Sequence, residues 1–177
     1  MAFEIRPIEA GDQLTGLSLG DAVFTPLKTF IQRNAKTYQE QSLARTYGAF
    51  STDDGTEGKL LGYLSLVCGE VVIENEDEVI VENVAYHYLH YPAVKIARLA
   101  VDRRARGQGI GRKFLDLALA IALGVIAPQV GCRFLMVDAK QPSVAFYEKL
   151  GFTLLDTAAN RARSEPIMFI DLAKVGT

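Results

Sequence analysis

Cysteine is scarce in this sequence, because Cys68 and Cys132 are the only two among 177 residues. They stand far apart and form no Cys-x-x-Cys pair, so we expect neither a disulfide framework nor a zinc site, and no other metal site. Free cysteine is among the most frequently buried residue types. We therefore predict that both thiols are reduced and lie in the core.

Long apolar runs are also lacking. None approaches the roughly 20 residues that a membrane-spanning helix requires, so we expect no membrane anchor. The first residues include Glu4, Arg6 and Asp12 and have neither the basic start nor the apolar middle of a secretory signal. The net charge of -2 is too small to steer partners globally. These absences predict a cytoplasmic protein.

The sequence contains no internal repeat, low-complexity tract or Pro/Ser-rich linker that would mark a domain boundary. A chain of 177 residues is long enough to bury a sizeable core and suits one compact domain. We expect a single domain over residues 1–177.

The hydrophobic pattern alternates between strand and helix lengths, which predicts an α/β core. Strands are expected at residues 2–8, 43–50, 59–68, 93–102, 133–139, 152–155 and 166–172. Helical patterns lie between Ala10 and Gln41, divided at Pro26, and again from Gly109, where Pro128 should end the helix. A short helix over residues 142–150 should end at Gly151.

The helix that starts at Gly109 has one apolar stripe, formed by Ile110, Phe114, Leu117, Ile121 and Val125. Beyond Leu117 the helix is apolar on nearly every side, so we expect that part to be buried.

An acidic segment, residues 70–82, contains no Lys or Arg. Two β-branched triplets flank its acidic centre, a pattern that fits a hairpin or an extended arm. The segment is either a solvated turn or a rim that attracts a cationic substrate, and the sequence leaves both alternatives open.

The strongest chemical signal is the glycine-rich junction between the strand at 93–102 and the helix that follows. Gly107, Gly109 and Gly111 allow backbone N–H groups to turn toward one point, and the helix N-terminus adds partial positive charge. The surrounding basic residues are Arg103, Arg104, Arg106, Arg112 and Lys113. This combination predicts pyrophosphate binding. The spacing fits neither a P-loop nor a Gly-x-Gly-x-x-Gly dinucleotide turn.

Residues 106–111, Arg-Gly-Gln-Gly-Ile-Gly, resemble the Arg/Gln-x-x-Gly-x-Gly/Ala pyrophosphate signature of the GNAT superfamily of N-acetyltransferases. The resemblance implies a GNAT-like domain, with a mixed central sheet of about six or seven strands flanked by about four helices. It also implies acetyl-CoA as the cosubstrate. The cofactor-binding residues that it implies are Leu99, Ala100, Val101, Arg106, Gly107, Gln108, Gly109, Ile110, Gly111, Arg112 and Ser143.

In that resemblance each part of the set has its own role. Backbone N–H groups of residues 108–112 would hold the pyrophosphate of CoA. Leu99 and Val101 would pair with the pantetheine arm, as an added strand would.

Tyr147 occupies the position at which many GNAT enzymes carry a tyrosine near the CoA sulfur. Adjacent helical residues lie about 100° apart, and we expect Phe146 to face the core and the Tyr147 hydroxyl to reach the cleft. A phenol with a pKa near 10 can share its proton with a thiolate whose conjugate acid has a pKa of about 8.5. We predict Tyr147 as the general acid, with a purely packing tyrosine as the alternative. Lys140 and Ser143 depart from the common family pattern of asparagine and alanine.

A base that accepts the amine proton is harder to assign. No Asp or Glu lies between Glu82 and Asp102, where some family members place a carboxylate. The only histidines, His87 and His90, fall in this interval and are candidate bases, directly or through water. The alternative is that both are solvated.

The front half of the chain also resembles the acetyltransferase toxins of bacterial toxin-antitoxin pairs, which acetylate the α-amine of aminoacyl-tRNA. Residues 44–47 and 98–102 carry this likeness, although Leu19-Gly20 stands where those toxins often have Cys-Gly. Four basic residues form either a tRNA-binding patch or a solvated face: Lys28, Arg33, Lys36 and Arg45.

We predict transfer of an acetyl group from acetyl-CoA to a primary amine by direct attack on the thioester. The alternatives are a toxin-type enzyme with tRNA as partner and a noncatalytic CoA-sensing module. The sequence is compatible with a homodimer.

Overall fold

The structure is a computed structural model that describes residues 1–73 and 89–175 of the chain. It contains two compact units, which we call unit 1 (residues 1–67 and 97–117) and unit 2 (residues 68–96 and 118–177). Most of the acidic segment and His87 lie outside the described residues.

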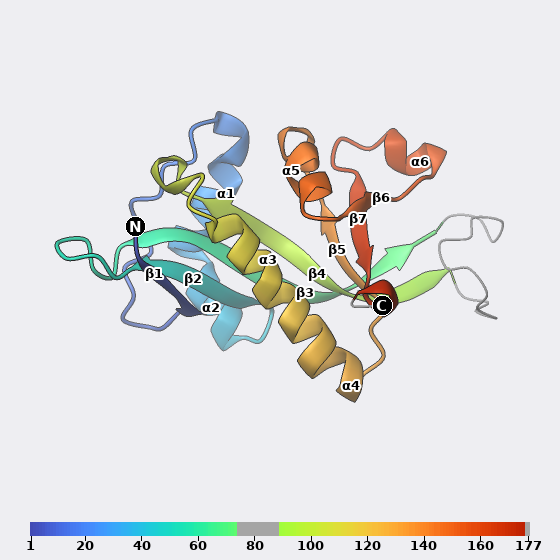
Figure 1. The fold of residues 1–177 in the computed structure, drawn as a ribbon, viewed down its shortest axis with the longest axis horizontal. Coiled ribbons are helices and arrows are strands. Elements are labelled where there is room, and N and C mark those ends of the chain that lie inside the picture. Colours follow the sequence, from blue (N-terminus) through green and yellow to red (C-terminus); the bar gives the residue numbers. More distant parts are fainter. Residues whose placement is uncertain (74–88, 176–177) are drawn as a thin grey trace. The chain divides into compact units, whose positions relative to one another are not determined.

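Seven strands form one sheet with the order β1-β2-β3-β4-β5-β7-β6 (Figure 1). The strands are β1 (Phe3–Pro7), β2 (Arg45–Ser51), β3 (Leu60–Val72), β4 (His90–Val101), β5 (Phe134–Asp138), β6 (Thr153–Leu154) and β7 (Ile167–Asp171). All seven expected strands are present, and β3 continues four residues beyond the expected end at Cys68. Pro7 is tolerated because β1 is an edge strand.

The sheet is mixed, as expected. Strands β1, β2 and β3 are antiparallel, β4 is parallel to β5, and β7 is antiparallel to both of its neighbours. The parallel pairing runs from Ala93↔Phe134 to Ile96↔Val137, while β4 itself continues to Val101. The α/β fold class is therefore confirmed.

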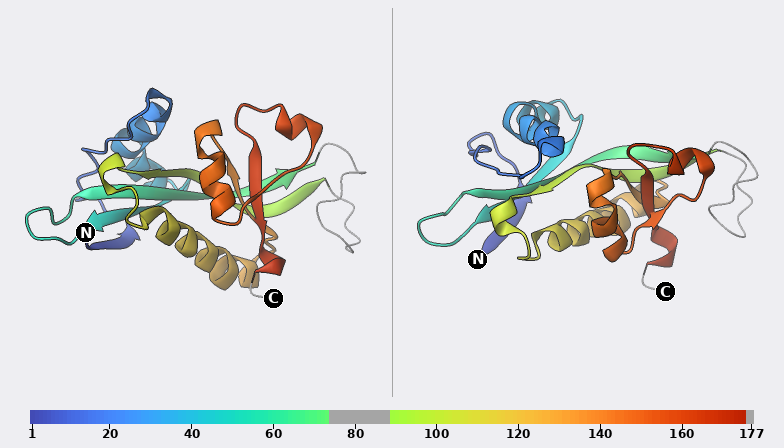
Figure 2. Two further views of the ribbon diagram at one scale, coloured as in Figure 1. Left: turned by 45° about the horizontal axis from the view of Figure 1, so that its top comes forward. Right: turned by 90° about the horizontal axis from the view of Figure 1, so that it is seen from above.

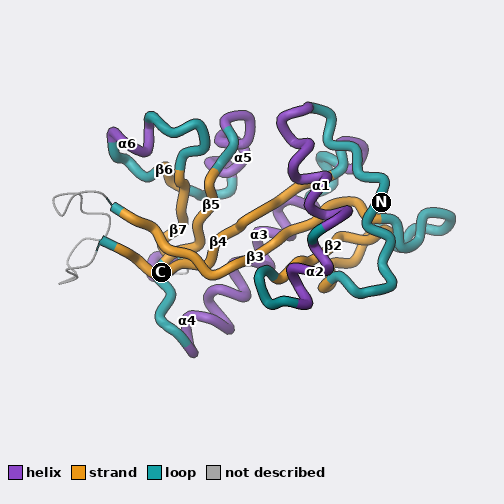
Figure 3. Tube along the Cα trace, turned by 180° about the vertical axis from the view of Figure 1, so that it is seen from behind, coloured by secondary structure: helices purple, strands orange, loops and turns teal. Residues whose placement is uncertain are grey.

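In unit 1, helices α1 (Thr25–Arg33) and α2 (Ala35–Glu40) lie on one face of β1 to β3, and the first turns of α3 lie on the opposite face (Figure 2). The core on the α1 side includes Phe30, Ile31, Phe50 and Tyr63. Figure 3, which views the structure from behind, shows α1 and α2 lying across these strands.

The expected helix break at Pro26 is wrong. Pro26 lies in the first turn of α1, where its missing N–H is not needed, and the two helices are divided at Asn34 instead.

The long helix after the glycine-rich junction changes character along its length. It comprises α3 (Ile110–Ile121), a π-helical stretch (Ala122–Ile126) and α4 (Ala127–Gln129), so Pro128 lies inside the last turn and does not end it. The expectation of burial on every side beyond Leu117 is also wrong, because the Val125 side chain is 56% exposed. A π-helical stretch widens the turn and shifts the phase of the stripe, and the buried positions are Ile110, Phe114, Leu115, Ala118 and Ala122.

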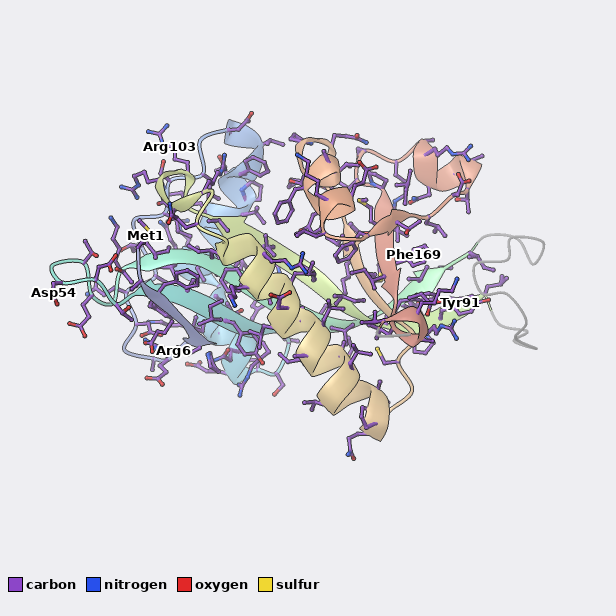
Figure 4. The ribbon with its side chains drawn as sticks, in the orientation of Figure 1. Met1, Arg6, Asp54, Tyr91, Arg103 and Phe169 are labelled. Carbon is purple, nitrogen blue, oxygen red and sulfur yellow. The ribbon has the colours of Figure 1, made fainter. Side chains whose placement is uncertain are left out.

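In unit 2, β5 is followed by α5 (Val144–Lys149), and α6 (Ala158–Arg161), which the sequence pattern did not predict, lies between β6 and β7. Phe134 packs edge-on against both Tyr91 and Phe169 in the core of this unit, and Figure 4 labels those two partners. The buried Asn160 amide holds the β6–β7 connection through its bonds to the carbonyls of Leu155 and Ile167.

The two cysteines do not both lie in the core. Cys68 is exposed and Cys132 is partly buried, so the predicted burial is wrong for Cys68. Burial alternates along the end of β3, and Cys68 shares the outward-facing side of the strand with Glu70.

No described helix is both long enough and apolar enough to span a bilayer. Within residues 1–73 and 89–175, no cluster of three His, Cys, Asp or Glu side chains is placed to hold a metal ion.

Candidate active site

The glycine-rich junction follows β4 as a short turn (Arg103–Ala105) and an exposed loop that leads into α3, and we call residues 103–112 the phosphate loop. Gly107 and Gly109 have φ angles of +80° and +79°, which residues with a side chain rarely adopt. A Cβ atom at either position would meet no other heavy atom within 4 Å. Glycine is therefore required by backbone conformation, and the space beside the loop is open.

The start of α3 provides backbone donors. The first helical bond runs from the Lys113 N–H to the Gly109 carbonyl, at 3.0 Å. The N–H groups of Ile110, Gly111 and Arg112 precede this bond and have no acceptor within the helix. They supply both hydrogen bonds and the positive end of the helix dipole to a bound anion.

The basic side chains around the phosphate loop are not equivalent. Arg103, which Figure 4 labels beside the loop, is exposed, as are Arg112 and Lys113. Arg112 also pairs with Asp116 at 3.0 Å on the helix surface. Arg106 is exposed, and one of its nitrogens donates to the Leu19 carbonyl at 2.8 Å.

Arg104 is held by Asp102, a buried aspartate directly after β4. The Asp102 carboxylate accepts bonds from the Arg104 side chain at 2.6 and 2.8 Å, from the Arg104 N–H at 2.9 Å and from the Ser18 N–H at 2.9 Å. Burial would raise the pKa of Asp102, but these hydrogen bonds outweigh it and hold the pKa far below its usual range. Arg104 thus serves the fold, and Asp102 ties the phosphate loop to the N-terminal segment around Ser18.

The last five residues of β4 provide an edge beside the phosphate loop. The register with β5 ends at Ile96, so residues 97–101 extend past it, whereas the Asp102 N–H still donates to Leu61 of β3 at 2.8 Å. Leu99 and Val101 are partly buried. Ala100 is 5% exposed and its side chain belongs to the core on the α1 side, so only its backbone is available to a ligand.

The two aromatic residues of α5 are placed in the opposite way to the prediction. Tyr147 is 5% exposed, and its ring packs between Phe146 and Phe152 with centroids 5.2 Å from each. Phe146 is 36% exposed, so it does not face the core. The Tyr147 hydroxyl makes no hydrogen bond with any residue in 1–73 or 89–175, although a buried tyrosine usually finds a partner. Burial raises the pKa of Tyr147 above its ordinary value.

The remaining predicted residues are more ordinary. Ser143 precedes α5 and forms no side-chain cap. Lys140 donates to Glu165 at 2.6 Å. His90 begins β4, eleven residues before its end at Val101, and its exposed ring lies 3.0 Å from Glu70. His87 is outside the described residues.

Residues 56–154, more than half of the chain, match the sequence profile of the Acetyltransferase (GNAT) domain. The chain belongs to the GNAT acetyltransferase family. It is therefore an N-acetyltransferase, and acetyl-CoA is its acetyl donor.

Three solved structures share the fold over nearly the whole chain. A tyrosine-to-phenylalanine mutant of KacT is 25% identical with a TM-score of 0.77, covering 98% of this chain and 96% of that one. AtaT complexed with acetyl-methionyl-tRNAfMet is 21% identical with a TM-score of 0.78, covering 97% and 96%. An AtaT mutant toxin bound to the C-terminus of the antitoxin AtaR and acetyl-CoA is also 21% identical, with a TM-score of 0.73 and coverage of 97% and 94%.

Two polar side chains near this GNAT loop were missed by the sequence analysis. The position of Asp102 directly before a basic turn could have indicated a cap, because aspartate often accepts backbone N–H groups at such starts. Arg98 of β4 stacks on Phe30 of α1. No local sequence pattern predicts this contact, because the two residues are 68 positions apart.

Proposed function

We propose that this protein transfers the acetyl group of acetyl-CoA to the α-amine of an aminoacyl-tRNA, by direct attack of the amine on the thioester. The proposal treats residues 1–177 as one catalytic domain. The thioester supplies an activated acyl group with a thiolate as its leaving group. The protein then has to bind the donor, lower the charge on the departing sulfur and admit a neutral amine.

The phosphate loop is the proposed donor site. The open, glycine-shaped backbone and the first N–H groups of α3 fit the diphosphate of CoA. Arg103, Arg106, Arg112 and Lys113 add countercharge from an exposed position. Leu99 and Val101 on the edge of β4 would pair with the pantetheine arm, the Ala100 backbone lies between them, and Ser143 would make a further contact.

Tyr147 is the proposed acid. The observation that carries the mechanism is its buried hydroxyl, which has no hydrogen-bond partner among residues 1–73 and 89–175. An unsatisfied buried hydroxyl costs stability, so its retention suits a group that acts on a ligand. Because burial raises the pKa of Tyr147, the phenol stays protonated throughout the neutral range. It can then donate a hydrogen bond to the sulfur as negative charge develops there.

The choice of an α-amine follows from proton chemistry. At pH 7 an α-amino group with a pKa near 8 is about one-tenth neutral, whereas a lysine with a pKa near 10.4 is less than about one-thousandth neutral and requires a strong base. His90 is exposed and lies beside Glu70, and it stays a candidate base together with His87. An acceptor that needs less help from a base suits a site whose candidate bases are these two histidines.

Aminoacyl-tRNA is favoured as the acceptor by the likeness to AtaT complexed with acetyl-methionyl-tRNAfMet, which covers 97% of this chain. Lys28, Arg33 and Arg45 are exposed and could contact tRNA phosphates. Lys36 is not part of this patch, because its amine donates to the carbonyls of Ala10 and Asp12 at 2.6 and 2.8 Å. We extend the proposal to an antitoxin partner by the same likeness to AtaT.

Turnover with defined acceptors tests this proposal. Thiol release from acetyl-CoA is followed with methionyl-tRNA, with small primary amines and with no acceptor. We expect turnover with methionyl-tRNA that is weakened when salt is raised. Turnover with small amines alone would remove tRNA as the acceptor, and binding of acetyl-CoA without turnover of any acceptor would point to the CoA-sensing module.

A further inference from the structure

Three arginine side chains stack on aromatic rings in the part of the chain that the structure describes. The guanidinium carbon of Arg6 lies 4.1 Å from the Phe50 ring centroid, and that of Arg133 lies 5.9 Å from Phe134. The tightest stack is Arg98 over Phe30, at 3.7 Å. The three stacks differ in what their N–H groups contact.

Two of these guanidinium groups are fully used by the fold. Arg6 forms two bonds to the Asp12 carboxylate, at 2.7 and 2.8 Å. Arg133 forms two bonds to Asp171 at the same distances. Paired in this way, each arginine fixes a connection within its own unit and has little capacity left for a ligand.

Arg98 has no such partner. Its side chain is partly buried, yet it makes no hydrogen bond or ion pair with any residue in the ranges 1–73 and 89–175. Cation–π attraction compensates for part of its lost hydration, but its five N–H donors, arranged in a planar fork, have no acceptor among the residues that the structure describes. A partly buried guanidinium held in this state is poised for an oxyanion.

The surroundings of Arg98 hold it in place. Phe30 is 4% exposed and packs against Tyr38 and Tyr63, with ring centroids 5.4 and 6.2 Å away. The Tyr63 hydroxyl donates to the Leu27 carbonyl at 2.7 Å, which fixes that ring under α1. Arg98 also directly precedes Leu99, one of the residues to which we assign the pantetheine arm.

We propose that Arg98 binds an oxyanion of the acceptor substrate through its fork of N–H groups, with Phe30 as a rigid platform. The inference rests on the proposed function, in which the oxyanion is a backbone phosphate of the aminoacyl-tRNA. A planar guanidinium binds two oxygens of one phosphate or carboxylate at once, which a lysine ammonium does not do. Arg98 would thus set which amines reach the thioester in a reactive position.

The test uses three acceptors that carry the same α-amine. Methionyl-tRNA offers phosphates, free methionine offers a carboxylate, and methionine methyl ester offers no oxyanion. The variants are Arg98→Gln, Arg98→Lys and the control Lys59→Gln, which removes one positive charge from an exposed position in the β2–β3 loop. Thiol release is measured for each pair, and thermal unfolding checks that each variant folds.

We expect Arg98→Gln to raise KM for methionyl-tRNA about tenfold or more, on the scale of one lost charged hydrogen-bonded contact. Turnover of the methyl ester should change less than about twofold, and Arg98→Lys should keep only part of the tRNA affinity. Lys59→Gln should change KM much less than Arg98→Gln does. Equal losses with methionyl-tRNA and methyl ester, at unchanged thermal stability, would overturn the assignment.

The outcome also separates this inference from the proposed acceptor. If the wild-type protein acetylates free methionine but not methionyl-tRNA, the tRNA proposal fails. The Arg98 assignment then stands only if Arg98→Gln selectively weakens the reaction of methionine relative to its methyl ester. If Arg98→Gln weakens the reactions of methionine and its methyl ester equally, the Arg98 assignment fails as well.

Discussion

We propose two different kinds of chemistry for the phosphate loop and for α5. In the loop, the backbone is the proposed binding group, and the glycines matter because they permit φ angles near +80°. In α5, a single hydroxyl carries the proposed chemistry, and the aromatic packing around Tyr147 protects it from water. The difference teaches that backbone sites leave a sequence motif, whereas side-chain sites depend on which face of a helix is buried.

The largest expected effect tests whether the backbone of the phosphate loop binds acetyl-CoA. Gly109→Val places a β-branched residue at a φ of +79° and crowds the open space beside the loop, so we expect acetyl-CoA affinity to fall about 100-fold or more. Calorimetric titration measures it. Gly55→Val is the matched control, since Gly55 has a φ of +80° in the β2–β3 loop. Wild-type affinity in Gly109→Val would refute a backbone site.

The second effect tests whether the Tyr147 hydroxyl of α5 takes part in the chemistry. Tyr147→Phe should lower kcat about 100-fold while leaving acetyl-CoA affinity unchanged, because it removes a donor to the departing sulfur. Its thermal stability should equal or exceed that of the wild type, since an unsatisfied buried hydroxyl is lost. Single-turnover kinetics and thermal melts measure the two quantities. An unchanged kcat would reduce Tyr147 to a packing residue.

The third effect asks what holds the loop. Asp102→Asn weakens the charged bonds to Arg104 and Ser18, and we expect a loss of about 2 kcal/mol in the free energy of unfolding together with weaker acetyl-CoA binding. Asp171→Asn is the control, because Asp171 is paired in the same way with Arg133 in unit 2. It should cost similar stability and leave acetyl-CoA affinity unchanged. Equal acetyl-CoA affinity in both variants would show that the contacts of Asp102 with Arg104 and Ser18 do not shape the phosphate loop.

The same aspartate predicts a pH dependence. Its pKa is lower in the folded chain than the value of about 3.9 expected after unfolding. The stabilisation from Asp102 is therefore complete above about pH 4 and is lost as the pH falls below that value. Urea unfolding from pH 3 to pH 7 should show the difference between wild type and Asp102→Asn shrinking at the acid end. A constant difference would contradict the assignment.

The smallest effect sharpens the contrast between two buried tyrosines. Burial raises the pKa of Tyr63 as it does that of Tyr147, and the positive charge of Arg98 opposes this only in part. Tyr63, however, donates to the Leu27 carbonyl. Tyr63→Phe should lower the free energy of unfolding by about 1 kcal/mol and leave kcat unchanged, the reverse of Tyr147→Phe. Denaturant titration and steady-state kinetics provide the two measurements.

Particular elements show which features of the fold can be predicted from local sequence patterns. Every expected strand is present, and the phosphate loop lies at the expected junction, because alternation and glycine spacing are local properties. The assignment of Phe146 and Tyr147 failed because α5 has six residues, too few for a stripe to reveal its buried face. The predicted apolar stripe of the long helix is wrong beyond Ile121, because a π-helical stretch there changes the helical period on which the prediction was based.

The sequence by itself determined the positions of the strands along the chain, the family and the glycine-shaped loop, because each depends on residues that are neighbours along the chain. The tertiary structure alone decided that Asp102 holds Ser18 and that Arg98 rests on Phe30, since these partners are brought together from distant positions. It also decided that the Tyr147 hydroxyl is buried without a hydrogen-bond partner among the described residues. Burial and charge are properties of the packed surroundings, and a linear pattern contains neither.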